Sequence, residues 1–527
     1  MKRFTLLRVL LWASAMAFAP QVNAQTADKQ VEPPTDAPAP ESVDTVVPAE
    51  EANISAADAR AAALEAQIEG LQAQITELKA AVTKATPSWK GAPQFADADD
   101  GWSFKVRGRL MLDTAYAPKP DNFATNRNLG FNTRVRRFRI GVEGGLPGGF
   151  GYKAEVDYAN SAVGFGDVVL TYAPAGKIFG FSFGNQESLD GMEQITSSRW
   201  SSFIERAQAN DAFGNTRRLG LVLGLHSKDN LLRFDTGLFA AHSIDASLDN
   251  DGWIGAARAT YTPYVGNGFV HLGLNFQHRE FQSNDNAAAS TSGGAPSTNQ
   301  IARYRARPFL QTTDVRYVDT GSFAAKSDNI FGAELYGVFK SLHVGGEVQY
   351  TKVNAYRAGD IATGLDAFNG GSLVTPTGDP SFFSGFFEVG YFLTGETRGY
   401  KNGAWDRTKV LHPFNKGGSG AFQLIGRFDY LDLDSSKLKD GLTNNFATGA
   451  TSLAALNSRL GRGGKQTGYL AGLTWIPTDY VRFLFNYIHT EVEGGPLAAT
   501  VKPLSTAPVD QRKYSTDAFA IRASIDW

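Results

Sequence analysis

Apolar and charged side chains alternate with a period of two along residues 102–116. One parity holds Trp102, Phe104, Val106, Leu110, Leu112 and Tyr116. The other parity holds Lys105, Arg107, Arg109 and Asp113. In a β-strand, successive side chains point to opposite faces, so this spacing separates an apolar face from a charged one. The stretch therefore predicts a strand with one apolar face and one charged, solvated face.

Two further runs repeat this pattern on either side of a tight turn. The second run sets Phe138, Ile140 and Val142 against Arg137, Arg139 and Glu143. The third run sets Phe150, Tyr152, Val156 and Tyr158 against Lys153, Glu155 and Asp157. The intervening GGLPGGFG supplies the glycine and proline that a chain reversal needs. A soluble β-sandwich also alternates in this way, so the membrane interpretation depends on the rest of the chain.

Sixteen strand-like runs fit between Trp102 and Trp527, each of about eight to twelve residues, the length of a tilted membrane strand. Past the N-terminal region the chain has no apolar run of about 18 residues, so no transmembrane helix is expected. Short connections, such as 173–177 and 340–341, alternate with long ones, such as 184–217 and 279–329; residues 394–420 break this alternation. We predict an all-β fold, a sixteen-stranded antiparallel transmembrane β-barrel over residues 102–527.

The N-terminal region divides into segments of different composition. Residues 1–24 combine Lys2 and Arg3 with an apolar core and a small residue, Ala24, which predicts a signal peptide; the alternative is an anchor helix. Residues 25–52 are rich in Pro, Ala and acids, which predicts a flexible acidic linker. A second linker is expected at residues 86–101.

Residues 53–85 carry a heptad pattern. One core position holds Ile54, Ala61, Ile68, Ile75 and Val82, and the other holds Ala57, Leu64, Leu71 and Leu78. This spacing of three and four predicts a short α-helical coiled coil that associates with other chains. In an isolated peptide, isoleucine and leucine at these positions favour a coiled coil of two helices. An attached barrel could impose a different number of helices. The alternative is one amphipathic helix lying on a neighbouring surface.

The residues that usually carry chemistry are scarce. There is no cysteine, so thiolate metal sites and disulfides are excluded, and the seven histidines have no metal-ligand spacing. No motif combines His, Ser and an acid in the way a hydrolase needs. We therefore expect no enzymatic activity, no catalytic residue, no metal and no cofactor. The formal net charge of -2 says little about partners, and no nucleic-acid partner is predicted.

Several segments resemble the phosphate-selective porins O and P of Gram-negative bacteria. They are FKVRGRL, VRRFRIGVEGGL, TSSRWSSFIER, VHLGL, YFLTGETRGYK and the final strand ending at Trp527. The resemblance covers residues 102–527. It implies a homotrimer of barrels in the outer membrane, in contact with lipid and lipopolysaccharide. It also implies a pore narrowed by infolded loops and lined with basic residues that attract phosphate or polyphosphate.

The resemblance implies an anion-binding constriction on the first two strands. Its arginines would be Arg109, in Gly108-Arg109-Leu110, with Arg136 and Arg137, and Arg139 adds a further charge. Guanidinium groups suit this role because they stay charged and offer a planar fork to phosphate oxygens. The alternative is a ladder on the barrel wall, in which these arginines only pair with Asp113, Glu143, Glu155 and Asp157.

A second basic set lies further along the chain. Arg303, Arg305 and Arg307 alternate, and Arg316 follows, which resembles the family's arginine ladder in a long infolded loop. A spacing of two projects the first three to one side of an extended segment. The alternative is a solvated loop or a contact with lipopolysaccharide phosphates. The chain departs from the family at Gln194, where a lysine is usual, and at Glu187; both departures weigh against high phosphate affinity.

The leading hypothesis is an outer-membrane porin of a Gram-negative bacterium that passes small anions, phosphate or pyrophosphate among them, by passive diffusion. The alternatives are a general porin and an envelope-tethering barrel whose coiled coil contacts peptidoglycan or a periplasmic partner. An outer-membrane hydrolase is the weakest hypothesis.

Overall fold

A computed structural model describes residues 60–77, 88–89, 91–97, 100–120, 129–159, 163–244, 252–281, 301–356, 376–438, 463–498 and 509–527. The predicted signal peptide, the acidic linker and both ends of the heptad segment lie outside these residues. The chain divides into two units, Met1–Glu77 and Leu78–Trp527.

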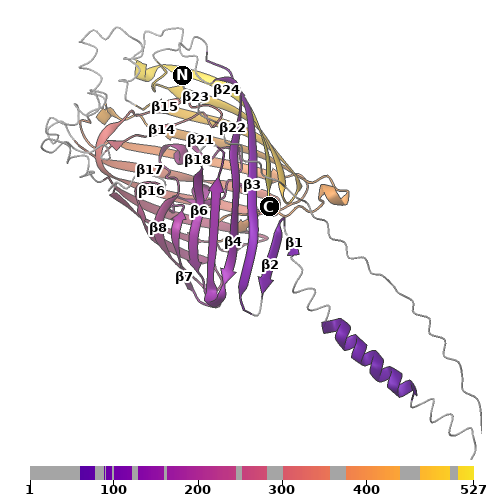
Figure 1. Cartoon of the computed structure of the whole chain (residues 1–527). Coiled ribbons are helices and arrows are strands. Elements are labelled where there is room, and N and C mark those ends of the chain that lie inside the picture. The colour runs from indigo at the N-terminus through magenta and orange to yellow at the C-terminus, as the bar shows by residue number, and fades with distance from the viewer. Residues whose placement is uncertain are drawn as a thin grey trace, which may run out of the picture. The chain divides into compact units, whose positions relative to one another are not determined.

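The second unit is a closed antiparallel barrel (Figure 1). Its sixteen strands are β3 (Trp102–Ala117), β4 (Gly130–Leu146), β5 (Phe150–Asp157), β6 (Gly164–Tyr172), β7 (Phe179–Gln186), β8 (Arg218–His226), β9 (Leu232–Ala240), β10 (Gly252–Tyr261), β12 (Gly268–Phe281), β16 (Phe323–Phe339), β17 (Leu342–Ala355), β18 (Ser381–Phe392), β21 (Ala421–Asp432), β22 (Lys465–Thr478), β23 (Val481–Glu493) and β24 (Lys513–Asp526). Each strand pairs with the next in this order, and β24 pairs with β3, Phe519 opposite Tyr116. The predicted sixteen-stranded barrel is confirmed.

The alternation of side chains follows the sequence pattern. On β3, Trp102 and Leu112 are exposed on the outer face, whereas Arg107, Arg109 and Asp113 are buried on the inner face. In the hydrocarbon core of a bilayer, every backbone N–H and C=O group must find its hydrogen-bond partner within the protein. A closed sheet meets this requirement because it has no unpaired edge strand. The outer face of the barrel is therefore suited to lipid.

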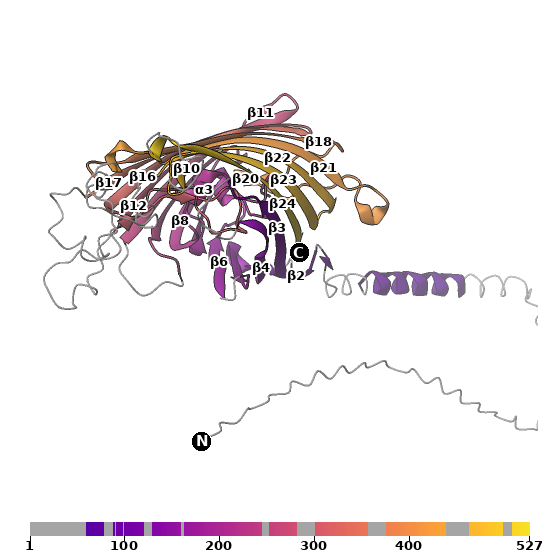
Figure 2. The same ribbon diagram turned by 90° about the horizontal axis from the view of Figure 1, so that it is seen from above.

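The connections differ in length at the two ends of the barrel. At one end, here called the short-turn end, tight connections such as the 3-10 helix η1 (Pro147–Gly149) join the strands. At the other, long-loop end, the connection between β7 and β8 carries the helices α2 (Met192–Ile195) and α3 (Gln208–Ala212). Helix α3 packs against β21 and β18 and against the short strand β14 (Arg305–Ala306), so this connection enters the lumen (Figure 2).

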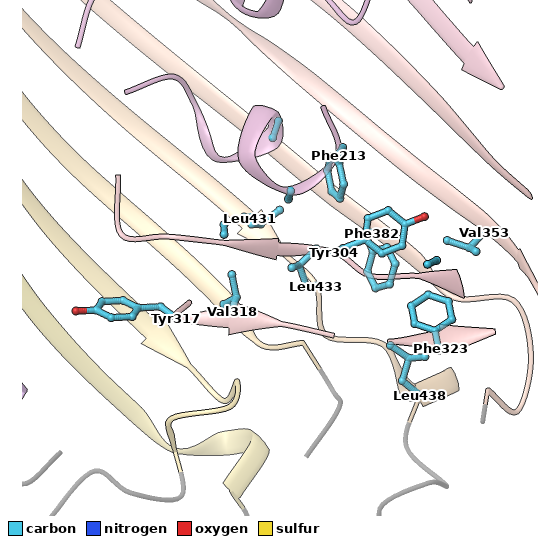
Figure 3. Close-up of a cluster of buried hydrophobic side chains, with 14 of the residues drawn as sticks. Phe213, Tyr304, Tyr317, Val318, Phe323, Val353, Phe382, Leu431, Leu433 and Leu438 are labelled. Carbon is cyan, nitrogen blue, oxygen red and sulfur yellow. The ribbon is translucent and has the colours of Figure 1, made fainter. Parts of the chain in front are cut away.

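A second long connection, between β12 and β16, also packs against the inside of the wall. It contains β13 (Ile301–Ala302), β14 and β15 (Val318–Asp319). Tyr304 and Tyr317 from this connection are buried with Phe382 of β18 and Leu431 of β21 (Figure 3). The ring centroids of Tyr304 and Phe382 are 4.9 Å apart. Aromatic packing of this kind fixes the connection to the wall at the long-loop end.

The connection at 394–420, which breaks the alternation of short and long connections, is long as expected and lies at the short-turn end. It carries β19 (Tyr400–Lys401), β20 (Ala404–Trp405) and the 3-10 helix η2 (Phe414–Lys416). Trp405 is buried against Tyr336 of β16, so part of this turn also enters the barrel.

In the first unit, residues 60–77 form a helix (Figure 1). Its heptad residues Leu64, Ile68, Leu71 and Ile75 are 58%, 52%, 56% and 49% exposed. The structure shows one short helix within the heptad segment but no coiled coil, which stays a prediction together with its association with another chain. Among the described residues, none of the helices has both the length and the apolar character needed to cross a bilayer.

Strands β1 (Ser88–Trp89) and β2 (Pro93–Asp97) occupy the segment predicted to be a linker at residues 86–101. Strand β2 pairs with β3, with Gln94 opposite Lys105. This part of the predicted linker therefore extends the sheet of the barrel unit.

Candidate functional site

A cavity of about 170 Å³ lies inside the barrel, between strand β4 and the two infolded long connections. The charged side chains that line it are four arginines and two carboxylates: Arg136, Arg137, Arg206, Arg307, Glu205 and Asp211. The lining therefore has two positive charges in excess. One water molecule needs about 10–15 Å³ of such space, so the cavity has room for a small ion with several waters.

A β-bulge on strand β4 brings two consecutive arginines to this cavity. Met111 of β3 pairs with Arg137, but the next residue, Leu112, pairs with Val135, so Arg136 is the additional residue. Strict alternation would turn Arg136 towards the outer face, whereas the bulge lets both arginines face the lumen. Simple parity counting in the sequence could not show this.

Arg136 is held by the connection that crosses the lumen. Its Nε donates to Oε1 of Glu205 at 2.7 Å and its Nη2 donates to Oε2 at 2.9 Å. Glu205 also pairs with Arg522 of β24, which binds Asp113 of β3 through two hydrogen bonds of 2.7 Å. Burial alone would raise the pKa of Glu205, but Arg136, Arg522 and Arg137 lower it to about 2. Glu205 is therefore a carboxylate at neutral pH.

Arg137 and Arg206 are the cavity arginines with the least compensation by carboxylates. The nearest acid to Arg137 is Asp157, at 3.8 Å from its Nε, and this Nε is buried without a hydrogen bond. Arg206 donates to the carbonyl oxygens of Glu193 and Thr196, at 2.8 and 2.7 Å, and forms no ion pair with a described residue. Burial lowers the pKa of Arg206, but a guanidinium stays protonated in proteins. Both groups can therefore supply positive charge to an anion in the cavity.

Arg109 of β3 and Arg139 of β4 belong to a network of ion pairs on the inner face of the barrel. Glu155 of β5 lies 3.3 Å from Arg109 and 2.8 Å from Arg139, and Asp157 lies 2.7 Å from Arg139. Arg109 also donates to the hydroxyl of Ser198, at 2.6 Å, in the infolded connection. These contacts match the ladder alternative for Arg109 and Arg139, and a role in anion binding stays a prediction.

The second predicted set lies around β14. Arg307 and Arg316 both bind Asp211 of α3, at 3.0 and 2.7 Å, and Arg303 binds Asp319 at 2.6 Å. Arg305 pairs with Asp319 through its strand backbone, but its side chain is exposed and its guanidinium forms no hydrogen bond or ion pair with the residues that the structure describes. Arg307 is therefore the only residue of this set among the cavity's lining residues, and Arg303 and Arg305 lie apart from the Arg136–Arg137 pair.

The two departures from the family pattern contact each other. Gln194 lines the cavity and donates through Nε2 to Glu187 at 2.7 Å. Glu187 also pairs with Arg217 at 2.9 Å. Asn210 donates to the amide oxygen of Gln194 at 3.1 Å. The acid at position 187 is thus compensated by an arginine, and Gln194 presents a neutral amide to the cavity.

The infolded turn from the short-turn end supports the infolded connection from the long-loop end. Arg398 donates to the hydroxyl of Ser202 at 2.8 Å and to the carbonyl oxygen of Trp200 at 3.3 Å. Its guanidinium lies 3.9 Å from the ring centroid of Trp405. The amide of Trp405 donates to the hydroxyl of Thr196 at 3.2 Å. Segments entering from opposite ends therefore meet inside the barrel.

Sequence reasoning did not single out Arg206, Glu205, Asp211 or Arg522. Arg206 and Glu205 end the TSSRWSSFIER segment, whose resemblance to the family was a usable signal. Asp211 and Arg522 carry no local signal, because their partners, Arg307 and Asp113, are distant in sequence.

Comparisons with known proteins show which family the chain is similar to. Residues 104–517 match the family of phosphate-selective porins O and P. The chain belongs to this family. This porin is also 32% identical over 417 residues to an uncharacterized protein of Caulobacter vibrioides, covering 77% of this chain and 72% of that protein. It is 23% identical over 432 residues to Porin O of Pseudomonas aeruginosa, covering 77% of this chain and 86% of that protein.

Among solved structures, the anion-selective porin from Comamonas acidovorans has a TM-score of 0.43 and 13% identity, covering 80% of this chain and 100% of that one. Family membership and the closed barrel together make this chain an outer-membrane porin. In outer-membrane barrels the short turns face the periplasm and the long loops face outward, which orients the two ends described above.

Proposed function

We propose that this porin passes small anions, phosphate or pyrophosphate among them, by passive diffusion through the cavity beside Arg136 and Arg137. The observation that carries this proposal is the excess of two positive charges in the lining of that cavity. An aqueous site with walls of low dielectric constant concentrates ions of the opposite sign. A net positive lining therefore favours anions over cations.

The positions of the other arginines support a path towards the cavity. Exposed Arg305 would attract anions on the long-loop side, and Arg307 lies next along the same extended segment and lines the cavity. Arg137 and Arg206 would then bind the anion, because they are the cavity arginines whose charge is least compensated by carboxylates. Charge-assisted hydrogen bonds from guanidinium to phosphate oxygen are strong and directional.

The neutral Gln194 argues for modest affinity. A lysine at this position would add a third excess charge, whereas the amide contributes only a dipole that Glu187 and Asn210 already engage. We therefore expect a general preference for anions with weak retention of phosphate, which suits a pore that must also release its ion.

The test is the zero-current potential of the purified porin in a planar bilayer under a chloride gradient, with and without added phosphate. We expect anion selectivity and block by phosphate. In the Arg137→Gln/Arg206→Gln variant, loss of two charged donors should weaken phosphate block about tenfold or more. Lys340→Gln, which removes one charge at an exposed short turn, is the control and should behave as wild type. Cation selectivity of the wild type would overturn the proposal.

A general porin is the second candidate, and the extensive pairing of arginines with carboxylates favours it. In that case the double variant would leave phosphate block unchanged. An envelope-tethering role is the third candidate, suggested by the exposed apolar stripe of helix 60–77. Deletion of residues 54–82 would then damage the envelope without changing conductance.

The porin is further proposed to be a homotrimer in contact with lipid and lipopolysaccharide, and to need no cofactor, metal or catalytic residue. Multi-angle light scattering of the protein in mild detergent should give three chains per particle. A single chain per particle would contradict the trimer.

A further inference from the structure

Helix 60–77 presents an apolar seam that none of the described residues covers. Leu64, Ile68, Leu71 and Ile75 recur at intervals of three and four residues, and each is about half exposed. Such a helix is stabilised in water when the seam packs against another helix with the same spacing. The seam is continuous over the described length of the helix, with Ala61 at its first core position.

The charges that flank the seam indicate what covers it. With Ala61, Ile68 and Ile75 at heptad position a, Arg60 falls at position g and Glu65 at position e. In a parallel, in-register coiled coil, each g residue faces the e residue five positions later on the partner helix. Arg60 of one copy then faces Glu65 of another. The next such pair is Gln67 with Gln72, two neutral amides that can also hydrogen-bond.

Within one helix, Arg60 and Glu65 are five residues apart, too far around the helix to face each other. The side chains three and four residues after Arg60 are Ala63 and Leu64, so no neighbouring acid on its own helix compensates it. A second copy of the same segment supplies the missing partner for both charges.

Membrane geometry gives an independent reason for the same orientation. Barrels in one membrane share one orientation, so any rotation axis relating copies runs along the membrane normal. Rotation about that axis keeps equivalent residues at equal heights. Helices that meet on the axis are therefore parallel and in register, as the Arg60 and Glu65 pairing requires.

We infer that residues 60–77 form a parallel, in-register coiled coil with the same residues of other copies of this porin, with Arg60 of each chain beside Glu65 of its neighbour. This interaction surface lies in a different unit from the anion pathway. It joins protomers and makes no contribution to ion selectivity.

The absence of cysteine from the chain makes disulfide cross-linking a clean test. Leu64→Cys places a thiol at core position d, and Ala66→Cys places one on the opposite face as a matched control. Packed thiols have a high effective concentration, so we expect the full-length porin to cross-link about tenfold faster or more at position 64 than at position 66. Equal rates, or no cross-linking at position 64, would overturn the inference.

A charge exchange separates the parallel arrangement from other packings. Added to Leu64→Cys, the substitution Arg60→Glu brings two acids together in each pair and should slow cross-linking severalfold. The combined Arg60→Glu/Glu65→Arg exchange recreates the pair and should restore the original rate. Failure of the exchange to restore it would overturn the parallel register. Anion selectivity should be unchanged in all these variants, so the outcome is independent of the proposed pore.

Discussion

Arg136 and Glu205 form a two-point ion pair, with hydrogen bonds of 2.7 and 2.9 Å, that joins the bulge of strand β4 to the connection crossing the lumen. Both side chains are partly buried, at 14% and 11% exposed. The pair holds the bulge of β4 against the connection that lines the cavity, and it neutralises one cavity arginine. In the proposed anion pathway, Glu205 would therefore limit the positive charge available to an anion.

Replacing this carboxylate should make the pore more selective for anions. Glu205→Gln keeps the shape and one acceptor but releases the charges of Arg136 and Arg522. The excess in the cavity lining would rise by one charge, so the zero-current potential should shift towards the anion limit and phosphate block should strengthen severalfold. Asp229→Asn, at an exposed short turn, is the control. A shift towards cation selectivity would contradict this account.

Stability should depend on pH through the same residue. The pKa of Glu205 is lowered from its ordinary value of 4.5 to about 2. A lowered pKa contributes stability above the ordinary value, and this contribution is lost as the pH falls from 4.5 towards 2. The free energy of unfolding in urea should therefore drop across this interval, by up to about 3 kcal/mol from this group.

The control for this pH dependence is Glu205→Gln, which cannot titrate. It should be less stable than wild type at pH 7 and should lose less stability between pH 4.5 and pH 2. An identical pH profile in the two proteins would show that other carboxylates dominate the acid response.

The fold could be predicted from the sequence because each strand carries its own evidence. The parity of Trp102 and Leu112 against Arg107 and Arg109 is local, and it matches the outer and inner faces observed. Strand number and the long turn at 394–420 also follow from local spacing. The sixteen-stranded barrel needed no information about tertiary contacts.

The site could be predicted only in part, because its charge balance is a tertiary property. The residues next to Arg136 in the sequence do not predict the β-bulge that turns its side chain inward. They also do not predict its ion pair with Glu205. Arg307 is compensated by Asp211, a residue 96 positions away. A list of arginines therefore indicates a basic lumen without showing which of them keep a charge available.

A lysine at position 194, which the family resemblance led us to expect, should strengthen phosphate binding. Gln194→Lys adds a positive charge to a lining that already has an excess of two, although Glu187 would compensate part of it. We expect about a fivefold tighter block by phosphate in bilayer recordings, roughly 1 kcal/mol at the effective dielectric of such a site. Gln194→Met, of similar length but uncharged, is the matched variant and should not tighten the block.

The barrel should also be sensitive to a single methyl group where β3 meets the end of the chain. Gly108 exchanges two backbone hydrogen bonds with Trp527, each of 3.1 Å. A Cβ at position 108 would lie 2.1 Å from the indole of Trp527, so Gly108→Ala must displace that ring. We expect a loss of about 2 kcal/mol in the free energy of unfolding, typical of an overpacked site.

Gly426→Ala is the matched control, because the nearest atom to its added Cβ is 3.9 Å away. This variant should unfold at the same urea concentration as wild type, or slightly higher, since alanine is less flexible than glycine in the unfolded chain. Adding Trp527→Ala to Gly108→Ala removes the clash and should recover part of the lost stability. Equal stability of Gly108→Ala and Gly426→Ala would mean that the Trp527 ring moves aside without cost, and the contact would then have no role in closing the barrel.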